Sequence, residues 1–165
     1  SGTGHSDLGD ILIMPATGQL KLNPGRAGTP DEGYRSRFSH DTEVARPGYY
    51  EVELADYGIK AQLTATQRVG IHKYTFPDNV DGHIILDLIH GIYNYDGKTL
   101  WANLRVENDT LLTGYRITNG WARTNYTYFA ISLSQPIKDY GYTDKGKLCI
   151  KVFGDGLIPT VIFRK

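Results

Sequence analysis

The first ten residues hold the densest group of small and polar side chains that could do chemistry. Ser1-Gly2-Thr3-Gly4 opens the chain, and Gly9 follows shortly after. A glycine-rich turn can hold a phosphate on its backbone N–H groups. However, neither the dinucleotide pattern G-x-G-x-x-G nor a P-loop ending in G-K-[ST] occurs here. We therefore predict a close-packed surface loop at this end rather than a phosphate site.

Histidines and carboxylates are the next candidates, because they form most metal sites that lack cysteine. The candidates are three residues near the start and three scattered histidines, namely His5, Asp7, Asp10, His72, His83 and His90. Their spacing matches neither a zinc motif nor a calcium loop. Cys149 is the only cysteine, so no disulfide within the chain and no cysteine-based zinc site is expected. We predict no metal site in this chain and interpret Cys149 as an inert strand residue.

Covalent and acid–base catalysis leave no recognisable signature in the sequence. The G-x-S-x-G pattern that presents a nucleophilic serine is absent. Glycoside hydrolysis needs a pair of carboxylates, and the chain has 18 acidic residues. Most of these acidic residues lie on polar strand faces or in turns. The sequence therefore predicts no catalytic residue.

Five aromatic residues could form a platform for sugars, because the apolar C–H face of a sugar packs on an aromatic ring. They are Trp101, Trp121, Tyr126, Tyr128 and Phe129. In β-sandwiches such residues more often fill the core or pair across strands. Core packing is the favoured interpretation, and an exposed aromatic strip is the alternative.

The charge balance excludes some partners. Lys plus Arg and Asp plus Glu both number 18, so the formal net charge is zero, and no basic stripe occurs. A nucleic-acid-binding protein normally carries a basic excess or a basic stripe. The apolar runs are only a few residues long, which is too short to span a bilayer. We expect neither a nucleic-acid partner nor a membrane span.

Strands are the elements that must position these residues, because apolar and polar residues alternate from residue 48 to the end. The expected strands are residues 50–54, 59–66, 68–76, 84–89, 100–106, 111–118, 126–133, 148–153 and 160–163. No segment shows the apolar stripe of a helix. Roughly eight to ten strands without helices predict an all-β fold, an antiparallel β-sandwich or barrel. Residues 23–37 interrupt the pattern with Pro and Gly and predict an exposed loop, a type of segment that is often functional or mobile.

Turn residues indicate how the strands connect. Hairpin turns are expected at Asp56-Tyr57-Gly58, Asp96-Gly97 and Asp155-Gly156. Gly70 suggests a β-bulge. Asp87 lies in a strand that is apolar on both faces, so it needs a polar partner or an exit to solvent.

A series of short strings is more informative than these patterns. The strings are Ser1-Gly2-Thr3-Gly4, Asp7-Leu8-Gly9-Asp10-Ile11-Leu12-Ile13-Met14-Pro15, Phe38-Ser39-His40, Pro47-Gly48-Tyr49-Tyr50, Leu63-Thr64-Ala65-Thr66, Arg68-Val69-Gly70, Tyr74-Thr75-Phe76-Pro77, Ile85-Leu86-Asp87-Leu88, Gly114-Tyr115-Arg116, Gly120-Trp121-Ala122 and Tyr128-Phe129. In this order and at these intervals, they resemble the N-terminal domain of glycoside hydrolase family 92. The resemblance covers about residues 1–140.

The resemblance implies an exo-acting α-mannosidase, largely of bacteria, that trims N-glycans or mannan in the periplasm or outside the cell. It implies a large, supersandwich-like β-domain packed against a C-terminal (α/α)6 barrel, with the active site between them. The implied mechanism is inverting and calcium-dependent, with a Glu acid and an Asp base. In inverting enzymes such carboxylates stand about 6.5–9.5 Å apart. Both carboxylates and the calcium ligands belong to the C-terminal domain.

By the same resemblance, residues 1–165 are expected to form one β-sandwich domain that is a fragment of a larger N-terminal domain. Ser1, Gly2, Thr3 and Gly4 are the residues expected near the substrate, because small residues permit close approach. We expect the chain alone to be inactive and to self-associate through exposed strand edges.

Two other hypotheses remain open. A free-standing carbohydrate-binding module requires an exposed aromatic strip that includes Trp101 or Trp121. A purely structural sandwich domain instead predicts that both tryptophans are buried.

Overall fold

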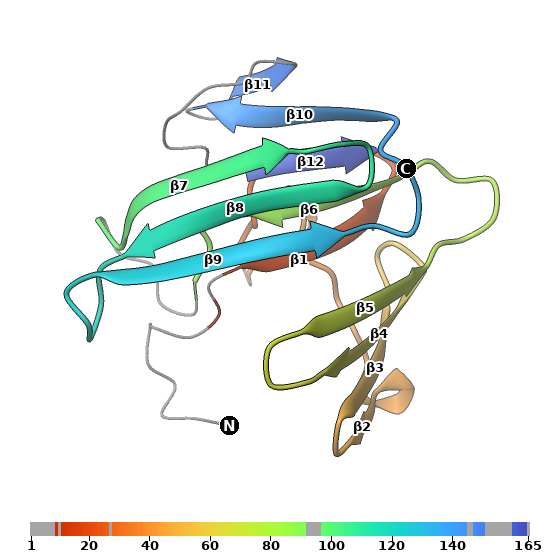
Figure 1. Ribbon diagram of the computed structural model, residues 1–165. Coiled ribbons are helices and arrows are strands. Elements are labelled where there is room, and N and C mark those ends of the chain that lie inside the picture. The colour runs from red at the N-terminus through yellow and green to blue at the C-terminus, as the bar shows by residue number, and fades with distance from the viewer. Residues whose placement is uncertain are drawn as a thin grey trace. The chain divides into compact units, whose positions relative to one another are not determined.

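The computed structural model describes residues 9, 11–26, 28–91, 97–144, 147–150 and 160–164. This part of the chain is all-β, with twelve strands, two short 3-10 helices and no α-helix. None of its helices is long and apolar enough to cross a membrane. The strands form three antiparallel sheets (Figure 1), which confirms the predicted class of an antiparallel β-sandwich. The chain divides into two units, residues 1–14 with 83–165, and residues 15–82.

The unit of residues 1–14 and 83–165 is a sandwich of two sheets. The first sheet has the order β1 (Leu12–Thr17), β6 (Gly82–Asp87), β12 (Thr160–Arg164), β10 (Asp139–Asp144) and β11 (Lys147–Ile150). The second sheet has the order β7 (Thr99–Val106), β8 (Leu111–Thr118) and β9 (Asn125–Ser132), and it lies in front of β1, β6 and β12 in Figure 1. Its inward side chains meet those of the first sheet in a core around Leu86, Leu88, Ala102 and Leu112.

The unit of residues 15–82 is built on a four-stranded meander. Its order is β2 (Val44–Arg46), β3 (Tyr49–Leu54), β4 (Ile59–Ala65) and β5 (Gly70–Thr75). Two 3-10 helices, η1 (Pro30–Glu32) and η2 (His40–Thr42), precede this sheet. The predicted alternation holds, because Val52 pairs with Ala61 and Leu54 with Ile59 on one face, with Val52, Ala61 and Ile59 buried.

Most predicted strands are confirmed, but the number of strands was underestimated. The sequence missed β1, β2 and β10. β1 contains Pro15, a residue that cannot donate to a sheet ladder. β2 has only three residues, and β10 has Gly141 and three polar residues among its six. Such segments carry too little alternation to be recognised without their partners.

The predicted turns had mixed outcomes. Asp56-Tyr57-Gly58 does connect β3 to β4, and Gly58 has a φ of +60°. Gly70 is not a bulge: it pairs with Ala65 and begins β5, at the base of a turn closed by Thr66 N–H donating to Val69 O. Gly97 does not lie in a hairpin, because β6 and β7 belong to different sheets. Asp96, Asp155 and Gly156 lie outside the described residues.

Asp87 at the end of β6 has the partners that its burial requires. Its Oδ1 accepts hydrogen bonds from the backbone N–H groups of Ile89 (2.8 Å) and His90 (2.9 Å). The adjacent segment is also held from β8 by Arg116, a fully buried residue. Arg116 donates to the carbonyl oxygens of His90 (2.8 Å) and Ile89 (3.2 Å). An acidic and a basic side chain therefore fix the backbone that leaves β6.

Candidate functional site

The sheet of β7, β8 and β9 separates its side chains onto two faces, as strand geometry requires. In β9 the exposure alternates strictly from residue to residue. Phe129 points inward and packs against the core, whereas Tyr126 and Tyr128, which precede it in the same strand, point outward. Gly114 in β8 makes room for the inward ring, since an added Cβ there would lie 2.5 Å from Phe129 Cζ.

The outward face carries two rows of side chains that run across the strands. Trp101 pairs with Ile117, which pairs with Tyr126. In the next row Asn103 pairs with Tyr115, which pairs with Tyr128. We call the five large residues of these rows the aromatic face; they are Trp101, Tyr115, Ile117, Tyr126 and Tyr128.

The aromatic face is open to solvent. The exposed fraction is 38% for Trp101, 57% for Tyr126 and 73% for Tyr128. Tyr115 is half-buried, and its ring centroid lies 5.8 Å from that of Tyr128 at an interplanar angle of 40°. The pair thus holds Tyr128 in place while leaving most of its ring accessible.

This exposure corrects the favoured interpretation of the aromatic residues. Of the five candidates, only Phe129 packs against the core. Trp121, in the connection between β8 and β9, is 82% exposed. A purely structural sandwich predicted buried tryptophans, and that prediction is wrong. In the pairing of β7 with β8, the register shifts between Thr99 and Trp101. Leu100, which lies at this shift, is exposed as well and adds to the exposed apolar surface.

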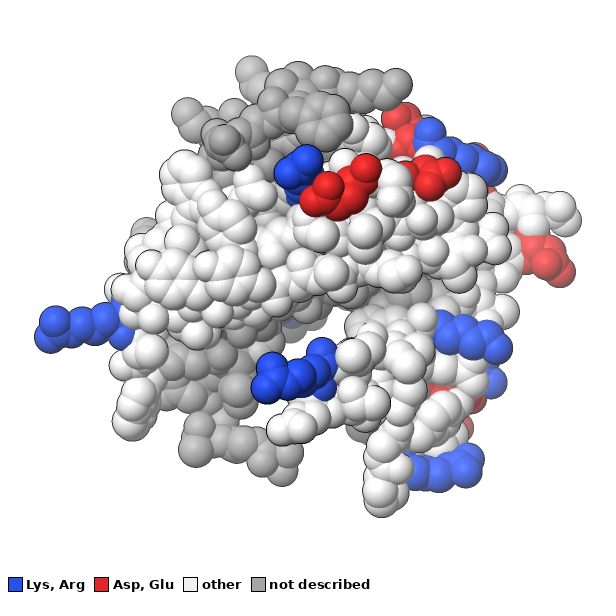
Figure 2. All heavy atoms as spheres, viewed as in Figure 1, with Lys and Arg blue, Asp and Glu red and all other residues white. Residues whose placement is uncertain are grey.

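Charged residues border the aromatic face but do not lie within it. Beyond its second row, Arg105 Nε lies 3.3 Å from Glu107 Oε2, and Thr113 Oγ1 donates to Glu107 Oε1 at 2.7 Å. In Figure 2 the broad surface over β7, β8 and β9 is drawn almost wholly in white, with coloured side chains at its margins. Such a face can bind an uncharged ligand, because none of its five side chains is Asp, Glu, His, Lys or Arg.

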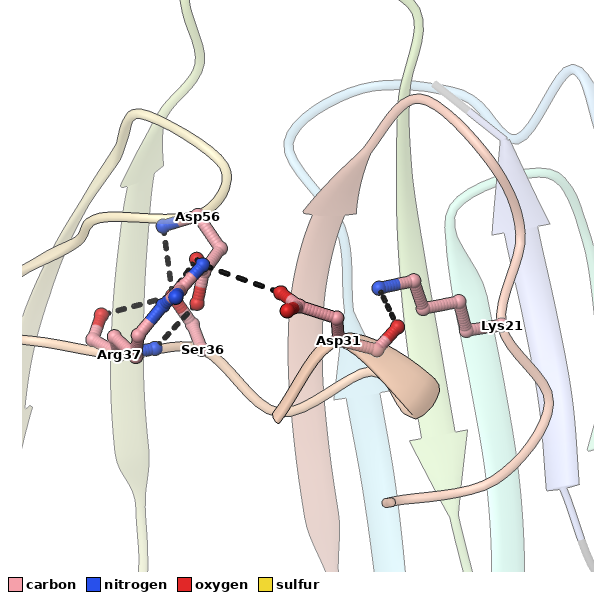
Figure 3. A network of polar contacts seen from close by, with 5 residues as sticks. All are labelled: Lys21, Asp31, Ser36, Arg37 and Asp56. Carbon is pink, nitrogen blue, oxygen red and sulfur yellow. Dashed lines mark hydrogen bonds and ion pairs between the residues drawn. The ribbon is translucent and has the colours of Figure 1, made fainter. Parts of the chain in front are cut away.

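The unit of residues 15–82 carries polar networks of a different kind. Arg37 donates from its backbone N (2.6 Å) and from Nε (2.7 Å) to the Asp56 carboxylate, and from Nη2 to Asp31 (3.2 Å). Lys21 Nζ donates to the backbone carbonyl oxygen of Asp31 at 2.8 Å. The network therefore runs from Lys21 through Asp31 and Arg37 to Asp56 (Figure 3). The hydrogen bond from Arg37 lowers the pKa of Asp56, and the same bond raises the pKa of Arg37.

Most of the described residues between 23 and 37 are exposed, as predicted, and this network anchors the segment. Arg37 fixes the segment to the turn after β3, and Tyr34 within it is buried. Gly25 and Gly33 bring two backbone stretches together, because a Cβ on Gly33 would lie 2.1 Å from Gly25 N. The segment is therefore anchored and partly buried.

Two carboxylates near β3 have lowered pKa values. Hydrogen bonds from Lys60 and Tyr49 lower the pKa of Glu51 to about 2, with Lys60 Nζ 2.7 Å from Glu51 Oε1. Hydrogen bonds from Tyr50 (2.5 Å) and His40 lower the pKa of Glu43. A general acid needs a raised pKa. Both carboxylates instead remain ionised at neutral pH, so they suit structural roles.

Of the other candidate site residues, the structure describes only the three histidines and Cys149. Ser1, Gly2, Thr3 and Gly4 lie outside the described residues, as do His5, Asp7 and Asp10. His72 is in β5, where its Nδ1 lies 2.7 Å from the Tyr74 hydroxyl, and His83 is in β6. Among the described residues, no group of three or more His, Cys, Asp or Glu could hold a metal. Cys149 lies in β11 opposite Tyr142 of β10.

Comparison with known proteins places this sheet architecture in a family. The Glycosyl hydrolase family 92 N-terminal domain matches residues 1–152. The structure of the family GH92 α-mannosidase BT3965 from Bacteroides thetaiotaomicron superimposes with a TM-score of 0.86 and 36% identity, covering 95% of this chain and 22% of that chain. No curated protein sequence matches the chain.

Two further solved structures agree with this assignment. The GH92 family glycosyl hydrolase ccman5 matches with a TM-score of 0.78 and 26% identity, over 95% of this chain and 22% of that chain. The GH92 inverting mannosidase BT2199 from Bacteroides thetaiotaomicron VPI-5482 matches with a TM-score of 0.70 and 25% identity, over 93% and 19%. The chain spans about a fifth of the length of these enzymes. The chain therefore belongs to glycoside hydrolase family 92, within its N-terminal domain.

Proposed function

We propose that this chain is the N-terminal sandwich part of a longer, calcium-dependent, inverting exo-α-mannosidase. It would complete the sugar pocket and support a catalytic (α/α)6 domain. The unequal coverage carries this proposal, because 95% of this chain matches only 22% of the α-mannosidase BT3965. The description of BT2199 as an inverting mannosidase supports the stereochemistry. We assign the reacting groups to the part of such an enzyme that this chain does not span.

The chemistry of inversion is consistent with that assignment. One carboxylic acid protonates the glycosidic oxygen while a second carboxylate takes a proton from water, which attacks the anomeric carbon from the opposite face. The acid must keep its proton at neutral pH, which requires a raised pKa. In the described residues, the carboxyl groups with shifted pKa values are Glu43, Glu51 and Asp56, and all three are shifted downward. None of these three suits the role of the acid.

Calcium belongs to the same proposal. It would bind sugar hydroxyls and favour distortion of the ring in the active site. The described residues do not fit such a site, because they bring no three candidate ligands together. We therefore assign the calcium ligands to the remainder of the enzyme. Export to the periplasm or beyond the cell would bring such an enzyme to mannan or N-glycans.

The contribution of this chain would be architectural. Ser1, Gly2, Thr3 and Gly4 would approach the sugar through backbone that carries little side-chain bulk. In the part of the chain that the structure describes, β7 and β9 are the outer strands of their sheet, and such edges would favour association of the isolated chain with itself. Sedimentation velocity of the purified chain would show this as a weight-average mass that rises with concentration. A monomer at every concentration would contradict the association.

Hydrolysis assays test the proposed function. The purified chain, incubated with α-mannobiose and calcium, should release no mannose above the rate without protein. The product of the whole reading frame should release mannose, initially as the β-anomer by proton NMR, and should lose this activity with a chelator. Turnover by the chain alone would contradict the placement of the carboxylates. An α-anomeric first product would contradict inversion.

A further inference from the structure

The aromatic face has the geometry of a binding platform built on rigid elements. Tyr126 and Tyr128 lie on one strand, two residues and therefore about 7 Å apart. Trp101 and Tyr126 lie on the two outer strands of the same row, with Ile117 between them. Backbone pairing along three strands fixes all of these positions. The rings thus form an area broad enough for more than one sugar ring.

The ring chemistry favours a sugar. Tyr and Trp combine an apolar ring face with a polar edge, and binding restricts rotation about only two side-chain bonds in each. The C–H groups on one side of a sugar ring pack on such faces, while its hydroxyls stay hydrated or bond to neighbouring polar groups. Arg105, Glu107 and Thr113 supply polar groups at one margin of the face.

The absence of charge within the face argues against other partners. A nucleic acid would require Lys or Arg against its phosphates, and no residue of the aromatic face is charged. A stable protein interface, which is also enriched in Tyr and Trp, has an apolar, well-packed centre. The only aliphatic residue in the two rows is Ile117, which is half-buried, and the most exposed members carry hydroxyl groups.

We propose that the aromatic face is a binding surface for neutral glycans, and that its ligands are α-linked mannose oligosaccharides. The choice of a neutral sugar rests on the face itself, whereas the choice of mannose rests on the proposed function. The face carries no catalytic group. It would hold a glycan chain against the protein and so raise its local concentration.

Calorimetry tests this proposal with the 165-residue chain and α-linked mannotetraose as the probe. We expect saturable binding with a Kd of about 1 mM or tighter. Tyr128→Ala and Trp101→Ala should each weaken binding by about five- to tenfold, through loss of a stacking surface. Tyr128→Phe, which keeps the ring, should bind within about twofold of the unchanged chain.

Matched controls separate loss of stacking from loss of folding. Phe38→Ala removes an aromatic side chain that is 51% exposed but lies in the unit of residues 15–82, and it should leave binding unchanged. Near-ultraviolet circular dichroism should show that the Tyr128 variants remain folded. No saturable binding, or binding that Trp101→Ala and Tyr128→Ala leave intact, would overturn the proposal.

Two further outcomes distinguish this proposal from its competitors. If Tyr128→Ala converts a dimer into a monomer and no sugar binds, a second copy of the chain occupies the face and the proposal is wrong. Binding of cellotetraose in place of mannotetraose would support a glycan surface but overturn mannose as its ligand. Failure of the hydrolysis assay with intact mannotetraose binding would contradict the proposed enzyme and support the binding surface.

Discussion

Two sheets of this molecule present their outer faces to solvent in opposite ways. On the meander of β3 and β4, Glu51 accepts hydrogen bonds from Tyr49 and from Gln62 (2.7 Å) and pairs with Lys60. On the sheet of β7, β8 and β9, the outward-facing positions instead hold Trp101, Tyr126 and Tyr128. Both faces belong to antiparallel sheets with one buried side, so the fold does not require the difference.

The contrast indicates which of the two faces lacks a partner. A solvated sheet face normally alternates polar residues with the buried ones, as the meander does. On that face Lys60 pairs with Glu51. The aromatic face instead exposes ring surface whose burial would be favourable, which marks a binding surface. The four predictions that follow test this contrast, beginning with the framework beneath the aromatic face.

Arg116→Met should have the largest effect. Arg116 is fully buried, and its loss removes the hydrogen bonds that it donates to the carbonyl oxygens of Ile89 and His90. We expect the free energy of unfolding to fall by about 2–4 kcal/mol, measured by urea denaturation followed by far-ultraviolet circular dichroism, which reports on both units. Arg37→Met is the matched control in the other unit, where the guanidinium is exposed, and its effect should be much smaller. Equal effects would show that burial of Arg116 contributes little.

Gly114→Ala should have the next largest effect. A Cβ at this position would lie 2.4 Å from Asn103 O and 2.5 Å from Phe129 Cζ, so β7 or the Phe129 ring must move. Such overpacking should cost about 1–3 kcal/mol of unfolding free energy. Gly28→Ala is the control, because no atom lies within 4 Å of its added Cβ. A Gly114→Ala variant as stable as the control would show that the sheet adapts freely.

As the pH falls, the meander that carries Glu51 should lose stability before the sheet that carries the aromatic face. The pKa of Glu51 in the folded chain is about 2, below its ordinary value of 4.5. A lowered pKa stabilises the fold above the ordinary value, and this stabilisation is lost as the pH falls from about 4.5 toward 2. We expect hydrogen exchange of β3 and β4 amides to accelerate over this range beyond its intrinsic pH dependence.

The tryptophans provide an internal comparison for that experiment. Trp101 and Trp121 are the only two, and both lie in the unit of residues 1–14 and 83–165. Over the pH range in which hydrogen exchange of the β3 and β4 amides accelerates, the tryptophan fluorescence should stay nearly constant. Glu51→Gln should reduce the acid sensitivity of β3 and β4. If the variant and the unchanged chain respond to acid alike, Glu51 is not responsible.

Tyr128→Ala should have the smallest effect on stability. Because 73% of Tyr128 is exposed, its truncation should change the free energy of unfolding by less than about 0.5–1 kcal/mol, including the lost contact with Tyr115. Thermal unfolding in the absence of sugar would measure this. A large loss of stability would mean that the ring is structural, and the contrast between the two faces would lose its meaning.

The sequence predicted the strands better than it predicted their partners. Alternation located β3, β4, β8 and β9, since one face of each strand is more buried than the other. It could not show that β6 and β7 belong to different sheets, because pairing between distant strands leaves no local trace. The turn signal at Asp96-Gly97 was therefore interpreted as a hairpin.

The site was harder to predict for the same reason. Alternation showed that Tyr128 and Phe129 lie on opposite faces, but not which of them faces the core. Only the register with β8, where Gly114 accommodates Phe129, decides this. The sequence indicated only one half of the anchor formed by Asp87 and Arg116, because it showed that Asp87 required a polar partner but not which groups supply it. In the sequence, Arg116 cannot be distinguished from an ordinary strand residue, because its burial depends on how the two sheets pack.

The most direct measurement of the central claim is an NMR titration of the chain with α-linked mannotetraose. We expect saturable shift changes at the Trp101 indole N–H and at amides of β7 and β9. The charged face of β3 and β4 should remain unperturbed and so serves as the internal reference. Changes confined to β3 and β4, or no saturable change at all, would contradict the assignment of the aromatic face as a glycan-binding surface.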